Sequence, residues 1–289
     1  MIELLAPAKV NLCLRVFGKT DSGLHNLDSI VVFCQFGDKI RMRLAERDIV
    51  DISGPFAPIL AATKSADNLV STARDAFRNN GGSCGPVAIH LEKYIPVGAG
   101  LGGGSADAAA VLRGLNKLAT TPLPHETLFA LSADLGSDVP VCLAATPHRI
   151  TGTGEAIHQL DDIHAGALLL VNPLVPLSTD AVFKQLAPPY NQALPEITEN
   201  DAVCLSGYGN DLEAVATRLV PEITDILQRF RRMPSCHAAQ MSGSGASCYG
   251  IFEDLAEATA ACTEFQQAGY WTKPTRLSPA DTLTDGISP

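Results

Sequence analysis

The amino-acid sequence predicts an α+β fold with two lobes, and three observations support this prediction. The chain has 289 residues, about twice the size of a typical domain, and 46% of them are hydrophobic, which is enough to build a substantial core. Strand-like and helical segments alternate along it without the regular strand–helix–strand rhythm of a barrel. A stretch of small residues and glycines at 144–155 divides these segments into two sets. We therefore expect one domain over residues 1–155 and a second over residues 156–289.

Hydrophobic periodicity predicts the elements of the first domain. Apolar residues alternate with other residues from Val10 to Val16, which is typical of a strand, and a glycine-containing loop follows at 18–25. The strongest helix of the chain is predicted at 106–119, where alanine is frequent and apolar residues recur at helical spacing. We expect further strands at 30–36, 39–44, 87–91 and 139–145, and further helices at 67–77 and 125–135.

The second domain is predicted to mix strands and helices in the same way. Apolar runs at 167–171 and 248–252 indicate two buried strands. The tail after Thr272 is rich in proline, aspartate and threonine, and we expect it to contribute little. Helices are expected at 210–219, 222–231 and 255–268, with a glycine-containing loop at 241–247.

Charge and cysteine usage exclude several classes of protein. The formal net charge is −10, and an acidic chain repels a polyanion, so we expect no nucleic-acid partner. None of the eight cysteines forms a CxxC pair and several lie in apolar runs, which indicates buried free thiols in a reducing compartment and no zinc site. The sequence opens with no signal peptide and has no run of about 18 apolar residues, so we expect a cytoplasmic protein with no membrane contact.

The most informative segment is the glycine-rich stretch PVGAGLGGGSADAAA at Pro96–Ala110. Five of the seven residues from Gly98 to Gly104 are glycine, and glycine allows the positive φ angles that turn successive N–H groups toward one point. The predicted helix begins directly behind, with its free amides facing the same point, and Ser105 can cap it or donate its hydroxyl to a phosphate or a metal. This arrangement predicts a cradle for a nucleotide triphosphate; the simpler alternative is a flexible turn.

Other glycine motifs fit this segment less well. The motif GxxxxGK[ST] fails because Gly104, not lysine, precedes Ser105. GAGLGG does match the dinucleotide motif GxGxxG, but Pro96 interrupts the approach of the strand and Glu126, the acid at the right distance, begins a helix. A dinucleotide-dependent oxidoreductase therefore stays an alternative. A serine hydrolase motif is excluded because Asp107 replaces its last glycine.

Three polar residues are candidates for catalysis or for substrate binding on their residue types alone. Transfer of a phosphoryl group to an alcohol needs a group that accepts the hydroxyl proton, and Asp138 in LGSDVP can do so or can instead be a turn or cap residue. Lys9 lies in an apolar strand, where its ammonium must meet an anion or reach the surface. Asn11 projects from the same face of that strand.

Three segments in the same order resemble the motifs of the GHMP kinase family. They are APAKVNLCLRV at 6–16, the glycine-rich stretch described above and MSGSGASCYGIF at 241–252. Within the family, the segments GLHNLDSI, DNLV, LGSDVPVCL, GTGE and GNDLE resemble the kinases of cytidine-diphosphate-linked methylerythritol in the non-mevalonate isoprenoid pathway. The resemblance implies an N-terminal lobe like ribosomal protein S5 domain 2, a ferredoxin-like C-terminal lobe and an active site between them. It also implies transfer of the γ-phosphate of ATP to an alcohol, with ATP and Mg²⁺ as cofactors.

The resemblance assigns roles to particular residues. It implies that Lys9 lies beside Asp138 and that both are catalytic. No acid beyond Asp138 is an obvious Mg²⁺ ligand, so we expect the ATP phosphates and Ser105 to hold the metal. His25 would read the cytosine edge and Phe183 would cover one face of the base. The remaining implied residues bind ATP (Pro96, Val97, Gly98, Ala99, Gly100, Leu101, Gly102, Gly103, Gly104 and Ser105, with Asn68 and Lys93 near the adenine) or the substrate (Asn11, Leu24, Thr179, Gly243 and Gly245).

One position departs from the family pattern. Leu24 stands where the family commonly has a tyrosine that stacks on cytosine, and the loss of such stacking costs about 1–3 kcal/mol. An aromatic from elsewhere, such as Phe33, could compensate. Leu24 keeps open a second enzyme function, a homoserine or sugar kinase of the same family, and a nucleotide-binding module without catalysis is the non-enzymatic alternative. We expect a monomer or a homodimer.

Overall fold

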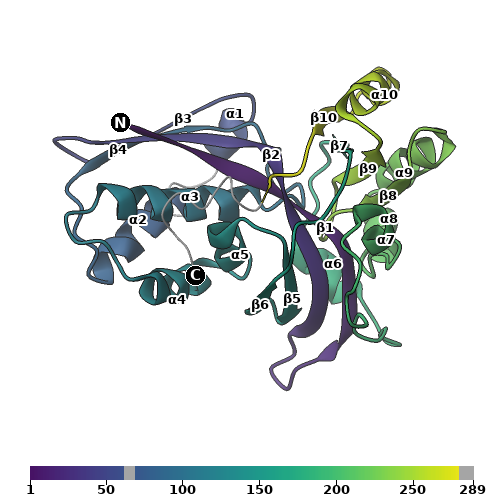
Figure 1. Cartoon of the computed structure of the whole chain (residues 1–289), viewed down its shortest axis with the longest axis horizontal. Helices are drawn as coiled ribbons and strands as arrows, with labels where there is room; N and C mark the ends of the chain where they lie inside the picture. The colour runs from purple at the N-terminus through teal and green to yellow at the C-terminus, as the bar shows by residue number, and fades with distance from the viewer. Residues whose placement is uncertain (62–68, 280–289) are drawn as a thin grey trace.

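The computed structural model describes residues 1–61 and 69–279, and two β-sheets organise this part of the chain (Figure 1). The N-terminal sheet has the strand order β3-β4-β2-β5-β6, with β1 paired along β2. Its central hairpin is unusually long, and β2 pairs with β5 near its start and with β4 near its end. The strands are β1 (Ile2–Lys19), β2 (His25–Leu44), β3 (Ile49–Ser53), β4 (Val87–Glu92), β5 (His148–Gly152) and β6 (Ala156–Gln159).

The two strands predicted at 30–36 and 39–44 are one strand, β2, which also begins earlier than expected, at His25. Gly37 explains the difference. A Cβ at this position would lie 2.1 Å from the carbonyl oxygen of Ala6, so β1 and β2 approach there more closely than any side chain permits. Gly37, which lies between the two predicted strands, therefore allows one strand to continue.

Helices cover one face of the N-terminal sheet (Figure 1). The longest, α3, buries alanines and larger apolar residues such as Val111 and Leu115 against the sheet, as its periodicity predicts. The predicted strand at 139–145 is wrong: this segment is the short helix α5. An apolar run that is buried all round has no period to distinguish the two, and Pro140 is tolerated in a first helical turn. The helices are α1 (Ala57–Ala61), α2 (Leu69–Asn79), α3 (Gly103–Leu118), α4 (His125–Leu135) and α5 (Val139–Ala144).

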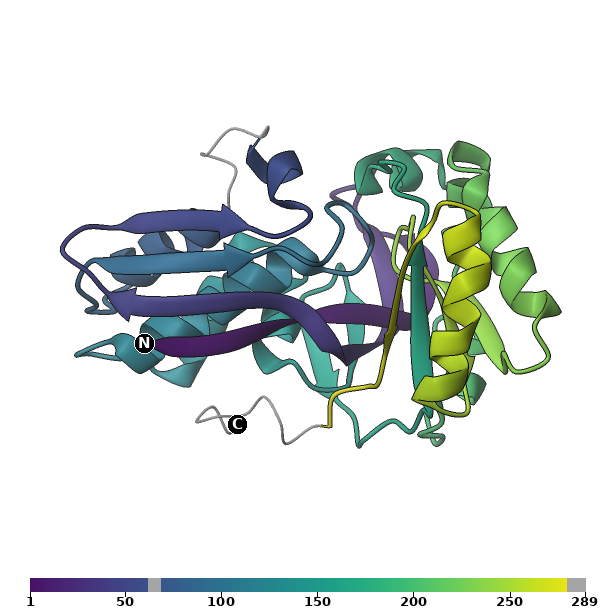
Figure 2. The same cartoon turned by 90° about the horizontal axis from the view of Figure 1, so that it is seen from above.

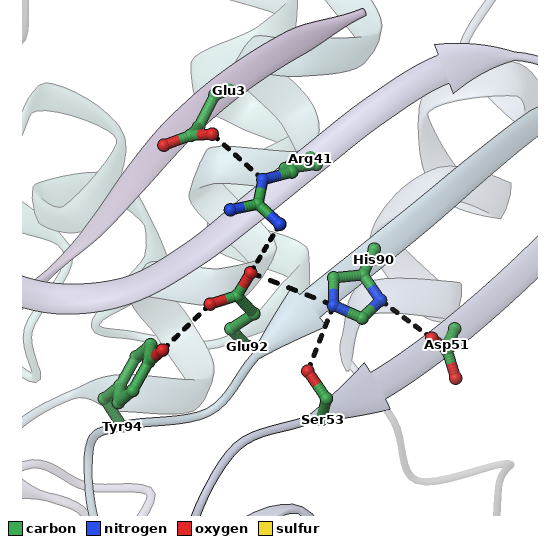
Figure 3. A network of polar contacts seen from close by, with 7 residues as sticks. All are labelled: Glu3, Arg41, Asp51, Ser53, His90, Glu92 and Tyr94. Atoms are coloured by element: carbon green, nitrogen blue, oxygen red, sulfur yellow. Dashed lines mark hydrogen bonds and ion pairs between the residues drawn. The ribbon is translucent and has the colours of Figure 1, made fainter.

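The opposite face of this sheet carries a polar network (Figure 3). Along β4, Val87, Ile89 and Leu91 are buried against the helices, whereas the residues between them are partly exposed on the other face. There the carboxylate of Glu92 accepts from the Tyr94 hydroxyl at 2.9 Å and pairs with Arg41 at 2.7 Å. The network continues through Glu3, His90, Asp51 and Ser53.

The C-terminal sheet has the strand order β10-β7-β9-β8 and lies beside the N-terminal lobe (Figure 2). The predicted strands β7 and β9 and the predicted helices α9 and α10 are confirmed. The prediction for the tail after Thr272 is wrong, because residues 271–275 form the edge strand β10; Pro274 hid this strand from the sequence, since proline is accepted at a sheet edge. The elements are β7 (Ala167–Asn172), α6 (Thr179–Gln185), α7 (Ala202–Ser206), α8 (Glu213–Leu219), α9 (Glu222–Arg232), β8 (Ala238–Met241), β9 (Cys248–Phe252), α10 (Leu255–Gln267) and β10 (Trp271–Thr275).

The two sheets share one apolar interface. Leu12 of β1 and Ile30 of β2 pack in the same buried cluster as Leu168 of β7 and Tyr249 of β9. The Tyr249 hydroxyl also donates to the carbonyl of Leu12 at 2.7 Å. The long β1–β2 hairpin therefore contacts both lobes, and the division of the chain at residue 155 stays a prediction.

The cysteines form no disulfide, as predicted. Burial raises the pKa of Cys34 and of Cys142 to about 12, so these thiols stay protonated and inert. Cys204 is exposed, which differs from the prediction that the cysteines are buried. Within residues 1–61 and 69–279, no helix has the length and apolar character needed to cross a membrane.

Candidate active site

A cavity of about 330 Å³ opens between the two lobes and is lined by residues from both. Lys9 and Asn11 reach it from β1, and the glycine-rich segment forms its N-terminal wall. Gly243 and Ser244, from the glycine-containing loop at 241–247, also line the cavity, so two glycine loops meet there. The candidate residues on its surface are Lys9, Asn11, Gly98, Ala99, Gly100, Gly102, Gly103, Gly104, Ser105, Asp138, Thr179, Phe183 and Gly243.

The first glycine loop has the backbone that its composition predicts. Gly98, Gly100 and Gly102 have φ angles of 67°, 72° and 64°, a region that favours glycine. Helix α3 begins at Gly103, so Gly102 and not Ser105 is its N-cap, and Ser105 lies in the first turn with its side chain on the cavity. The free amides of this turn face the cavity, which is the geometry of an anion cradle.

Close backbone approaches fix the loop in place. The carbonyl of Leu101 accepts from the N–H of Lys9 at 2.9 Å, which ties the loop to β1. A Cβ on Gly102 would lie 3.1 Å from Cβ of Lys9, and one on Gly100 would lie 2.6 Å from the carbonyl oxygens of Ser242 and Gly245. The loop can therefore lie against β1 and the C-terminal lobe only because these positions lack side chains.

The second glycine loop, residues 242–247, is joined to the first through Ser242. The Ser242 hydroxyl donates to the carbonyl of Gly100 at 3.0 Å and accepts from the N–H of Asn11 at 3.1 Å. Gly243 faces the cavity. A Cβ on Gly245 would instead meet Met241 and other apolar side chains of the C-terminal core, so Gly245 shapes the loop from behind.

Lys9 and Asp138 form an ion pair on the cavity surface. Nζ of Lys9 lies 2.7 Å from Oδ1 of Asp138; the lysine side chain is 5% exposed and the aspartate side chain 40%. Asp138 immediately precedes α5, but its side chain caps no helical N–H. The carboxylate is therefore not used as a cap, and it faces the cavity with the ammonium behind it.

Asn11 presents an unused acceptor beside this pair. Its Nδ2 donates to the Ser29 hydroxyl at 2.8 Å, and that hydroxyl donates to the carbonyl of Cys13 at 2.6 Å. The Oδ1 atom of Asn11 is buried and has no hydrogen-bond partner. Because a buried polar atom normally has a partner, this oxygen indicates a place where a ligand donor binds.

An aromatic group lies at the far end of the cavity. Phe183, on helix α6 with Thr179, lines the cavity, and its ring lies 5.1 Å from the ring of His25. Tyr190 packs edge-on against the other side of this contact, with its ring 6.0 Å from His25. Nε2 of His25 is buried and unpartnered. Thr179 shares a hydrogen bond of 2.8 Å with Ser244 of the second glycine loop.

Comparison with known proteins identifies the family. A model of the GHMP kinase N-terminal domain matches residues 68–146, and a model of the C-terminal domain matches residues 191–270. A protein of Paramagnetospirillum magneticum named 4-diphosphocytidyl-2-C-methyl-D-erythritol kinase is 40% identical over 279 residues, or 94% of this chain and 97% of that protein. The chain belongs to the GHMP kinase family.

Further comparisons agree with this assignment. A Brucella abortus protein of the same name is 42% identical to this GHMP kinase, with 96% of each covered. A solved structure of a 4-(cytidine 5′-diphospho)-2C-methyl-D-erythritol kinase has a TM-score of 0.81 at 31% identity and covers 95% of this chain and 99% of that one. The homoserine kinase of Cytophaga hutchinsonii, at 17% identity and a TM-score of 0.64, shares the fold. The predicted two-lobed α+β fold of the GHMP kinases is therefore confirmed.

Several predicted site residues of this GHMP kinase lie away from the main cavity. Leu24 is 58% exposed at the tip of the β1–β2 hairpin, and Phe33 is buried in the N-terminal core. The backbone carbonyl of Leu101 ties the loop to β1, but the Leu101 side chain is buried in the apolar cluster that the two sheets share. Asn68 lies outside the described residues. Pro96, Val97 and Lys93 line a second cavity of about 190 Å³, which adjoins the first at Gly98, Gly103 and Gly104.

Sequence reasoning missed four residues that the structure places at the site. Ser242 lies in the second glycine loop, of which only Gly243 and Gly245 were expected at the site. Tyr190 follows two prolines in a segment without periodicity, and only its aromatic type could have drawn attention to it. Ser29 supports Asn11 from β2. Asn210 donates to the carbonyls of Met241 and Gly243, both at 2.8 Å, which also explains why α8 begins at Glu213 and later than predicted.

Proposed function

We propose that this GHMP kinase transfers the γ-phosphoryl group of ATP to the 2-hydroxyl of 4-(cytidine 5′-diphospho)-2-C-methyl-D-erythritol. The observation that carries the proposal is the Lys9–Asp138 pair, which lies on the same cavity as the glycine-rich cradle. The relatives that bear the name of this activity match nearly the whole chain, which favours this substrate over homoserine or a sugar.

The residues present fit ATP. Gly98 and Gly104 line both cavities, and a Cβ at Gly98 would meet nothing within 4 Å, so the loop leaves open space for phosphate groups. The second cavity has apolar walls that include Leu60, Val70 and Leu91, which suits a nucleobase. The backbone N–H groups at the start of α3 form the positive end of the helix dipole and can bind the phosphates without any excess of basic side chains.

Asp138 and Lys9 divide the work of the transfer. The substrate hydroxyl loses its proton to Asp138 as its oxygen forms a bond to the γ-phosphorus, and the bond from that phosphorus to the bridging oxygen of ADP breaks. Lys9 orients the carboxylate and keeps positive charge beside the reacting oxygens. The Oδ1 of Asn11 accepts a hydrogen bond from the bound substrate.

The residues also fit a magnesium ion that arrives with the nucleotide. Within residues 1–61 and 69–279, no three histidine, cysteine or acidic side chains gather as a metal site. The Ser105 hydroxyl lies on the cavity in the first turn of α3 and would complete the coordination by ATP phosphates. Bound there, Mg²⁺ would neutralise charge on the β- and γ-phosphates.

His25 and its aromatic neighbours form the base site of this proposal. Burial lowers the pKa of His25, with a smaller contribution from Lys19, so the imidazole is neutral at physiological pH. A neutral imidazole has one donor and one acceptor nitrogen, and cytosine presents both kinds of group along its edge. Phe183 offers its ring to one face of the base.

The test is ADP release by the purified protein with Mg-ATP and each alcohol in turn. Release with the cytidine substrate, and not with homoserine or galactose, is the expected result. Release with another of these alcohols would move the assignment to another GHMP kinase activity. Tight ATP binding without ADP release on any acceptor would favour a binding module.

A further inference from the structure

Three buried charged residues meet beneath the first glycine loop. Nζ of Lys93 lies 2.5 Å from Oδ2 of Asp38 and 2.6 Å from Oδ2 of Asp107. The three side chains are 3%, 0% and 4% exposed. A buried ion cluster of this kind costs much desolvation energy, so it is a weak source of stability and a good candidate for fixing one geometry.

The cluster joins three elements at the entrance of the loop. Asp38 belongs to β2, and its Oδ1 accepts from the backbone N–H groups of Tyr94 and Ile95 at 2.5 and 2.8 Å. Asp107 belongs to helix α3, directly after the loop. Lys93 follows β4, directly before the loop. Both ends of the loop are therefore attached to β2 through the same three side chains.

The segment that enters the loop, residues 93–95, is also anchored on the opposite face of the sheet. The Tyr94 hydroxyl donates to Glu92, which also pairs with Arg41 (Figure 3). Tyr94 is thus anchored by its backbone to Asp38 inside the lobe and by its side chain to the outer network. Residues 93–95 consequently enter the loop with little freedom.

The ammonium of Lys93 also lies directly against the nucleotide cradle. A Cβ on Gly103, the first residue of α3, would lie 3.1 Å from Nζ of Lys93. Both carboxylates already contact this ammonium at hydrogen-bond distance. The charge of Lys93 is therefore matched inside the protein and is not left for a phosphate.

The charge balance agrees with a positioning role. Two carboxylates and one ammonium would leave a net negative charge next to amides that bind phosphate. Burial, helped by the nearby Asp38 carboxylate, raises the pKa of Asp107 to about 8 against the opposing effect of Lys93. With Asp107 protonated, the cluster carries no net charge and does not repel the nucleotide.

We propose that Asp38 and Asp107 are positioning residues for nucleotide binding, which act through Lys93 to hold the glycine loop in its phosphate-binding form. Asp38 is the critical member because it alone contacts both the ammonium and the backbone of residues 94–95. Asp107 accepts from the ammonium through Oδ2, and its Oδ1 has no hydrogen-bond partner. The inference rests on the proposed use of ATP, but not on the identity of the alcohol.

Two isosteric variants and a matched control test the proposal by calorimetric titration with ADP. In Asp38→Asn, the side-chain oxygen can keep its hydrogen bonds to the backbone N–H groups of residues 94 and 95. The side-chain NH₂ group then faces the ammonium of Lys93, where two donors meet. In Asp107→Asn, the oxygen can stay toward Lys93 while the NH₂ takes the unpartnered side. The control is Asp28→Asn, which removes a buried carboxylate that pairs with Arg149 at 2.7 Å, in the same lobe but outside the two cavities.

We expect Asp38→Asn to weaken ADP binding at least about tenfold, because the substitution misplaces a buried hydrogen bond to a charged group. Asp107→Asn should stay within about threefold of the wild type, and Asp28→Asn should lose thermal stability with unchanged ADP affinity. Unchanged affinity in folded Asp38→Asn, or an equal loss in the Asp28→Asn control, would overturn the positioning role. If the wild type bound no ADP, the proposed function would fail with it. If Asp38→Asn does not fold, Asp107→Leu, which removes the second carboxylate contact of the Lys93 ammonium, takes its place under the same criterion.

Discussion

Lys9 and Asp138, which lie far apart in the sequence, meet with Nζ 2.7 Å from Oδ1 at the wall between the glycine cradle and the substrate side of the cavity. The lysine comes from the buried middle of β1 and the aspartate from the residue before α5. The ammonium is on the buried side and the carboxylate on the open side. This order suits a base that must reach a substrate and a cation that must hold the base.

Replacement of Lys9 by methionine tests the role of the cation. Methionine keeps the apolar stem but removes the charge beside the reacting oxygens, so kcat should fall by about 10²–10³-fold. Affinity for ADP should change little, because backbone amides of the loop hold the phosphates. Steady-state kinetics and titration with ADP measure the two quantities. A variant with near-normal kcat would show that Lys9 serves only the fold.

The glycine at position 102 is predicted to be essential, and its neighbour at 104 provides the control. In Gly102→Ala the residue must adopt a φ of 64°, and its Cβ would press on Lys9 from 3.1 Å, so we expect a loss of about 1–3 kcal/mol in unfolding free energy. In Gly104→Ala the new Cβ meets only Leu69 at 3.5 Å, which is ordinary contact. Urea unfolding of the two variants should therefore differ clearly. Equal stability of both would mean that the loop moves to accept a side chain.

Tyr190, rather than Leu24, is predicted to support the base site. Its ring packs edge-on against His25, whose ring in turn neighbours Phe183 on the cavity, whereas Leu24 is mostly exposed. Tyr190→Leu should raise KM for the cytidine substrate up to about tenfold, since the edge-on ring contact that holds His25 is worth about 0.5–1.5 kcal/mol. Tyr190→Phe should restore the affinity, and Leu24→Ala should change KM less than about twofold. A larger effect of Leu24→Ala than of Tyr190→Leu would instead show that Leu24, at the hairpin tip, contacts the base.

The raised pKa of Asp107 predicts how stability depends on pH. In the unfolded chain this carboxyl titrates near the ordinary value of 3.8, but in the folded protein near about 8. Between these values the folded state binds more protons, so this group's contribution to the unfolding free energy falls as pH rises from 3.8 to about 8. Denaturant unfolding over this range should show a steeper decline for the wild type than for Asp107→Asn. Parallel curves would mean that Asp107 is already ionised in the folded protein over this pH range.

Much of the architecture was predictable because its signals are local. The alanine-rich helix α3, the uninterrupted apolar strands β7 and β9 and the glycine-rich loop each carry their own pattern within a few residues. The errors arose where distant contacts decide. Gly37 looks like a break until the carbonyl of Ala6 is seen against it, and the apolar segment 139–145 has no period that separates helix from strand.

The candidate site shows the same division. Residue types alone identified Lys9 and Asp138 separately, and only the family resemblance implied that they lie side by side; in the structure they form an ion pair because α5 brings Asp138 to β1. Lys93 was expected near the nucleotide, but its carboxylate partners were not expected: Asp107 lies within the glycine-rich stretch, where only its backbone neighbours drew attention, and Asp38 comes from β2, outside any motif. Tyr190 lies in a segment whose sequence has no pattern at all.

The most direct measurement of the central claim is the kcat for ADP release by Asp138→Asn, with Mg-ATP and the cytidine substrate, beside an ADP titration of the same variant. Asparagine keeps the shape of the side chain but cannot take the hydroxyl proton, so kcat should fall by about 10²–10⁴-fold while ADP affinity stays near that of the wild type. A folded Asp138→Asn protein that turned over at the wild-type rate would contradict the assignment of Asp138 as the base.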